Sequence, residues 1–150
     1  MKVLTAPLWE LAEFEEGKAL LDRGKGHVAF SGLYDSQKLH MVYGLTEKYD
    51  VKLIVTYSDM KAKELLDDCK LYCRESYYFP AKDLIFYQAD IHGNQLTKER
   101  IRCLRRMMEG RPFTVVTTFG SLLAPQIPLS VFRDNVITVS CNGSLDEKKM

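Results

Sequence analysis

The stretch "VKLIVTYSDMKAKELLDDCKLYC", residues 51–73, predicts the clearest strand of the chain and a helix directly after it. Its first part is an apolar, β-branched run, typical of a strand that is covered on both faces. Asp59 is the expected cap of a helix over residues 60–73. A covered strand followed at once by a helix is the repeating unit of parallel α/β proteins.

The same alternation extends in both directions from this unit. We expect two short helices in residues 8–21, interrupted near Gly17, and a helix over 36–49 capped by Ser36. A loop at 91–95 precedes a helix that begins at Thr97, with Ile101, Leu104 and Met108 on one stripe, and a short helix follows in 121–128. Further strands are expected at 27–32, 75–79, 112–120 and 135–143. Such an order predicts a three-layer α/β fold, a mostly parallel sheet flanked by helices. We expect one domain over residues 1–142, with N-terminal helices in 1–26, sheet and helices in 27–142, and a tail or the start of a following domain in 143–150.

Composition excludes several classes of function. The chain has 150 residues, with 21 Lys and Arg against 20 Asp and Glu, so no overall positive charge indicates a nucleic-acid ligand. We expect neither a membrane span nor a signal peptide, because apolar runs are short and the first residues include several acids. Cys69 and Cys73 lack a second clustered pair, so we expect reduced thiols, no metal site and a cytoplasmic protein.

Residues 32–39, "GLYDSQKL", follow the outline of a phosphate-binding loop, G-x-x-x-x-G-K-[ST], with two changes. Gly32 and Lys38 stand at their expected positions. Gln37 replaces the second glycine, and Leu39 replaces the hydroxyl residue that would bind magnesium. A plain strand-turn-helix corner is the alternative interpretation, and under it the loop binds no nucleotide.

Two longer stretches carry a family resemblance. "YYFPAKDLIFYQADIHGNQLTKERIRCLRRMMEG", residues 77–110, and "PFTVVTTFGSLLAPQIP", residues 112–128, resemble the N-terminal region of the bacterial transcription-repair coupling factor, Mfd. That region is similar to the excision-repair protein UvrB and typically has a degenerate phosphate loop. The resemblance covers roughly residues 8–140 and implies a UvrB-like, P-loop-type domain.

The resemblance also implies a division of labour. The coupling factor is an ATP-driven DNA translocase that displaces stalled RNA polymerase and recruits UvrA. Its motor, which uses ATP and magnesium, and its main contacts with polymerase and UvrA lie in regions beyond these residues. This chain is therefore expected to be a non-catalytic scaffold without a cofactor, whose partners are other domains of the parent protein. The alternative is a free-standing nucleotide-binding enzyme with an unusual loop.

A basic helix face is the second candidate site. Lys98, Arg102, Arg105 and Arg106 are spaced to share one side of a helix, which suggests phosphate contacts with DNA or, alternatively, a solvated or salt-bridged face. Other candidates have structural interpretations: the aromatic residues Tyr77, Tyr78, Phe79, Phe86 and Tyr87 as core, Asp83 and Asp90 as turn or cap residues, and His40 and His92 as structural or surface residues.

Overall fold

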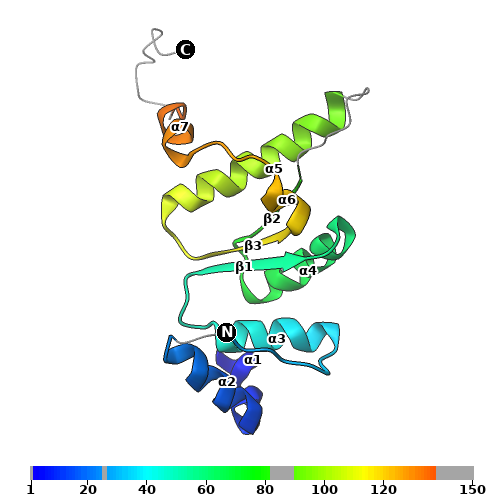
Figure 1. Ribbon diagram of the computed structural model, residues 1–150, viewed down its shortest axis with the longest axis vertical. Coiled ribbons are helices and arrows are strands. Elements are labelled where there is room, and N and C mark those ends of the chain that lie inside the picture. Colours follow the sequence, from blue (N-terminus) through cyan, green and yellow to red (C-terminus); the bar gives the residue numbers. More distant parts are fainter. Residues whose placement is uncertain (1, 25–26, 82–89, 138–150) are drawn as a thin grey trace.

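The computed structural model describes residues 2–24, 27–81 and 90–137, and within these ranges the chain is mixed α/β (Figure 1). Strands β1 (Val51–Thr56), β2 (Ser76–Phe79) and β3 (Phe113–Thr118) form a parallel three-stranded sheet in the order β1-β3-β2. The helices are α1 (Lys2–Thr5), the 3-10 helix η1 (Ala6–Glu10), α2 (Ala12–Asp22), α3 (Asp35–Leu45), α4 (Asp59–Tyr72), α5 (Asp90–Glu109), α6 (Phe119–Leu123) and α7 (Leu129–Asp134). The parallel sheet flanked by helices confirms the predicted α/β class.

Strand β3 is the centre of the sheet, and all of its residues are buried. The covered strand predicted here is confirmed. The same prediction for β1 is wrong, because β1 lies at the edge of the sheet. The side chains of Val51 and Leu53 are 56% and 57% exposed.

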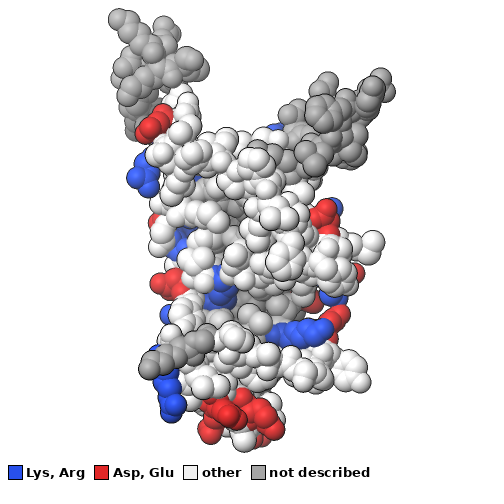
Figure 2. Space-filling view, in the orientation of Figure 1, with Lys and Arg blue, Asp and Glu red and all other residues white. Residues whose placement is uncertain are grey.

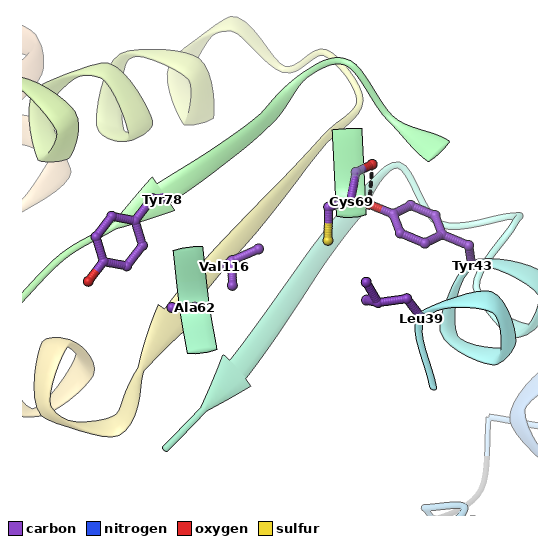
Figure 3. Packing of buried hydrophobic residues seen from close by; sticks show 6 residues of the cluster. All are labelled: Leu39, Tyr43, Ala62, Cys69, Tyr78 and Val116. Atoms are coloured by element: carbon purple, nitrogen blue, oxygen red, sulfur yellow. Dashed lines mark hydrogen bonds between the residues drawn. The ribbon is translucent and has the colours of Figure 1, made fainter. Parts of the chain in front are cut away.

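One face of the sheet packs against α4. Figure 3 shows Val116 and Tyr78 of the sheet with Ala62 and Cys69 of α4, while Leu39 and Tyr43 join them from α3. The Tyr43 hydroxyl lies 3.0 Å from Thr114 Oγ1 and donates to the Cys69 carbonyl at 3.5 Å. Helix α4 begins after Ser58, whose hydroxyl accepts from the Lys61 backbone N–H at 3.2 Å, so Ser58 and not the predicted Asp59 is the cap.

The opposite face packs against α5. Cys103 of this helix is fully buried against Phe79, Phe113 and Val115. Helix α5 begins at Asp90, so the loop expected at 91–95 is helical instead. The glycine in this segment costs only about 1 kcal/mol of helix stability, and the helix continues through it.

The stripe that we expected on α5 is also displaced. The helix turns Cys103 and Arg100 into the interior, whereas Ile101 is 46% exposed. Leu104 and Met108 are half-buried on the flank beside the buried face.

The N-terminal helices and α3 form a second cluster around Leu8, Phe14, Met41 and Leu45. Helix α2 continues through Gly17, so the expected interruption is wrong. A Cβ at Gly17 would lie 2.6 Å from the ring of Phe30, so glycine allows this close approach.

The strand expected at residues 27–32 does not form. Residues 27–34 are irregular, and Phe30 and Leu33 pack against the N-terminal cluster rather than the sheet. Residues 135–137 are not a strand, and the rest of the final predicted strand lies outside the described residues. Helix α7 was not predicted.

On the face seen in Figure 2, the Lys and Arg side chains do not form one large basic surface. Acidic side chains collect at the end of the molecule formed by the N-terminal helices, where α2 carries Glu13 and Glu15 in its first turn. Across the described ranges, no helix is long and apolar enough to cross a membrane.

Candidate functional site

The altered loop lies at the amino end of α3 and is not preceded by a strand. Gly32 is exposed and has a φ of +76°, a backbone conformation that residues other than glycine rarely adopt. A Cβ at Gly32 would meet nothing within 4 Å. The backbone conformation, rather than lack of space, therefore favours glycine here.

Gln37 contributes to the start of the helix. Its side-chain Oε1 accepts a hydrogen bond from the Tyr34 backbone N–H at 3.0 Å, while Tyr34 occupies the cap position. A side chain that reaches back to the cap residue satisfies a donor that the helix leaves unpaired. This contact gives Gln37 a structural role where a phosphate loop has glycine. The prediction that Ser36 caps the helix is wrong, because α3 already includes Ser36.

Lys38 is paired with a carboxylate of its own helix. Its amine lies 3.0 Å from Asp35 Oδ1, and the amine of Lys61 from α4 lies 2.6 Å from Asp35 Oδ2. Lys61 also contacts Glu64 Oε2 at 3.0 Å. Hydrogen bonds from Lys61 and then Lys38 lower the pKa of Asp35, and the bond to Asp35 raises the pKa of Lys61.

Leu39 points away from this network and into the core. Its side chain is 3% exposed and packs with Tyr43 and Ala62 between α3 and α4 (Figure 3). A phosphate loop has a hydroxyl at this position to bind magnesium. Here the position serves to attach α3 to the rest of the fold.

The arrangement is therefore poorly suited to an anion. A phosphate near Lys38 would meet the Asp35 carboxylate, and like charges at short distance repel. Strand β3 ends not in acids but in Thr118, whose Oγ1 lies 2.9 Å from Ser121 Oγ and caps α6. Within the described ranges, no group of His, Cys, Asp and Glu side chains could hold a metal ion.

The four basic residues of α5 are not equivalent. Lys98, Arg102 and Arg105 are exposed. The side chain of Arg106 is 12% exposed and contacts Glu75 at 3.3 Å and Glu109 at 2.6 Å. Arg106 therefore holds α5 beside β2. Lys98, Arg102 and Arg105 are more exposed, and Arg105 Nε lies 3.6 Å from Glu109 Oε1.

The other candidate residues predicted from the sequence lie at separate places in the structure. Tyr78 and Phe79 are buried, as expected for core residues. His40 lies on α3, and its Nε2 is 2.6 Å from the Leu4 carbonyl oxygen, which is a structural contact. Asp83, Phe86 and Tyr87 lie outside the described residues, as do the side chains of Asp90 and His92.

Sequence reasoning missed Arg100, which is 8% exposed. Its guanidinium stacks 4.2 Å from the Phe79 ring centroid and donates to the Pro80 carbonyl and, at 2.5 Å, to Gln126 Oε1. Burial lowers the pKa of Arg100. Its place three residues before Cys103 was the available signal, because residues three apart share a helix face.

Comparisons with protein-family models, with curated proteins and with solved structures find no match for this chain.

Proposed function

We propose that this chain is a non-catalytic interaction module whose altered loop does not bind a nucleotide. The observation that carries the proposal is the pairing of both Lys38 and Lys61 with the carboxylate of Asp35. A phosphate loop needs an unopposed lysine and backbone N–H groups directed at the anion. Here Lys38 and Lys61 both pair with a carboxylate of the protein itself.

The sequence motifs supply the family part of the proposal. On their evidence we assign the chain to the N-terminal, UvrB-like module of a transcription-repair coupling factor. In that role it acts as a scaffold beside the other domains of the parent protein. ATP and magnesium act in the parent's motor, which lies outside these residues.

A weak contact with DNA is a secondary part of the same role. Lys98, Arg102 and Arg105 are exposed on one side of α5, where they can approach a phosphate backbone. Three surface cations support sequence-independent and salt-sensitive binding at most.

A thermal unfolding experiment with magnesium and ATP tests the central part. A ligand at one hundred times its dissociation constant would add about 2.7 kcal/mol to the free energy of unfolding. We expect no upward shift of the melting temperature at millimolar ATP. Lys70→Ala is a matched control for Lys38→Ala, because Lys70 pairs with Asp67 at 2.8 Å, also three residues away on a helix surface.

The opposite outcome would favour the free-standing nucleotide-binding enzyme. Gly32 keeps the positive φ, and Lys38 keeps the spacing, that such an enzyme requires. A melting temperature that ATP raises in the wild type and in Lys70→Ala, but not in Lys38→Ala, would replace our proposal with that one.

A further inference from the structure

Residues 124–128, "APQIP", form an extended connection from α6 to α7, which we call the strap. Ala124 and Pro128, at its two ends, have φ and ψ of −68°, 138° and −54°, 140°, close to the polyproline II conformation. Each proline fixes its own φ and restricts the residue before it, so only Gln126 neither is a proline nor precedes one. We therefore expect the strap to move as one stiff piece.

The side-chain amide of Gln126 holds the strap between α5 and the carboxyl end of β3. Its Oε1 accepts from the Arg100 guanidinium at 2.5 Å, and its Nε2 donates to the Ser121 carbonyl at 3.2 Å. Arg100 is 8% exposed and stacks on the Phe79 ring, whereas Ser121 is fully buried and its Oγ lies 2.9 Å from Thr118 Oγ1. Both partners of the amide are therefore fixed in the interior, although Gln126 itself is exposed. We call the hydrogen bond between Arg100 and Gln126 the latch.

Helix α7 is carried at the far end of the strap. Figure 1 shows the strap running from α6 past α5 to α7. No residue of α7 is buried, and within the described ranges its hydrogen bonds join residues 128–136 to one another. Examples are the bond from the Phe132 backbone N–H to the Pro128 carbonyl at 3.0 Å and the bond from Asn135 Nδ2 to the Val131 carbonyl at 2.7 Å. The position of α7 relative to the sheet therefore depends on the position of the strap.

The latched arrangement is favoured, and its release is local. Removing Gln126 from Arg100 would leave the buried guanidinium with fewer hydrogen-bond partners, which is unfavourable. The packing of α5 on the sheet, through Cys103, Phe113 and Val115, does not involve the strap. Release would therefore free α7 while the sheet and α5 stay folded, as in other local openings of native proteins.

We propose that the strap and the latch form a conformational device that sets the position of α7. When Gln126 is bound to Arg100, the stiff strap has one direction across α5, and α7 has one position relative to the sheet. When Gln126 is released, the strap turns and carries α7 with it as an intact helix. This inference does not depend on the proposed loss of nucleotide binding.

Nuclear magnetic resonance relaxation measures the motion of α7 in the intact chain. In the wild type, the backbone order parameters of α7 should match those of α4, about 0.85. Gln126→Ala should lower them in α7 to below about 0.6 and leave α4 and α5 unchanged, because the latch is lost and the core is not touched. Asn135→Ala is the matched control, since it also removes an amide hydrogen bond to a carbonyl, but one that lies inside α7. Residues 129–133 should stay ordered in this control.

Exchange of the Arg100 guanidinium protons with solvent separates the latch from the strap. Gln126→Ala uncovers the guanidinium, so this exchange should become roughly tenfold faster or more. The double substitution Pro125→Gly and Pro128→Gly removes the stiffness of the strap but keeps the latch. It should lower the order parameters of α7 while the guanidinium exchange stays slow.

Several results would overturn the proposal. One is an α7 that is already mobile in the wild type, and another is an α7 that stays ordered in Gln126→Ala or in the double glycine variant. Loss of order in α4 and α5 together with α7 in Gln126→Ala would also overturn it, because release would then not be local.

Discussion

Lys38 Nζ lies 3.0 Å from Asp35 Oδ1, so the lysine of the altered loop is bound by the chain's own carboxylate. Lys61 approaches the other oxygen of Asp35 and connects the amino ends of α3 and α4. The position that would attract a phosphate in a nucleotide-binding loop here joins two helices. This difference underlies the functional proposal and most of the predictions.

The ion pairs of Asp35 with Lys38 and Lys61 should stabilise the fold at pH values above the acid range. Its two lysine partners lower the pKa of Asp35 in the folded state. A carboxylate with a lowered pKa contributes stability that is present above its unfolded pKa, about 3.9, and is lost as pH falls through the folded value. Asp35→Asn should therefore reduce the free energy of unfolding near neutral pH and have little effect at acid pH.

Denaturant titrations of the wild type and Asp35→Asn across pH measure this difference. The network is solvent-exposed, so the effect should be small and should decrease in high salt. A difference between the two proteins that grows toward acid pH would contradict the assigned role of Asp35.

Restoring the motif at Leu39 should damage the fold. Leu39→Thr removes apolar contacts with Tyr43 and Ala62 and places a hydroxyl in a site that is 3% exposed. We expect a loss of about 2–4 kcal/mol in the free energy of unfolding, measured by denaturant titration. Leu39→Met, which nearly conserves volume, should cost less than about 1.5 kcal/mol. Equal stability of Leu39→Thr and the wild type would show that this position does not hold α3 in place.

Binding to DNA should be weak and should depend on the exposed cations of α5 alone. The double substitution Arg102→Ala and Arg105→Ala should remove any fluorescence-anisotropy signal with short duplex DNA at low salt, irrespective of sequence. Arg106→Ala should mainly lower stability, because it removes the ion pairs that Arg106 makes with Glu75 and Glu109. Binding that survives both the double substitution and raised salt would point to a different surface.

The sequence was sufficient for the α/β class and for the central strand. The apolar run in 113–118 and the amphipathic helices on either side of it carry local signals that the structure follows. Strand β1 has an equally apolar sequence, but its edge position depends on the order β1-β3-β2. Sheet order is set by contacts distant in sequence, which periodicity does not report.

The candidate site, too, could be predicted from the sequence only in part. The altered positions Gln37 and Leu39 could be read from the motif, and the contact between Lys38 and Asp35 is local. Lys61 joins Asp35 from a different helix, 26 residues along the chain, and no pattern in the sequence connects the two. The strand expected at 27–32 failed because Phe30 finds its apolar partners in the N-terminal cluster.

Calorimetric titration of magnesium-ATP into the wild type, Lys38→Ala and Asp35→Asn tests the central claim most directly. We predict no saturable binding to the wild type or to Lys38→Ala up to roughly 1 mM nucleotide. Asp35→Asn, which removes the carboxylate shared by Lys38 and Lys61 while Lys61 keeps its contact with Glu64, should show at most weak attraction for phosphate that does not require magnesium. Saturable, magnesium-dependent binding to the wild type that Lys38→Ala abolishes would contradict the account.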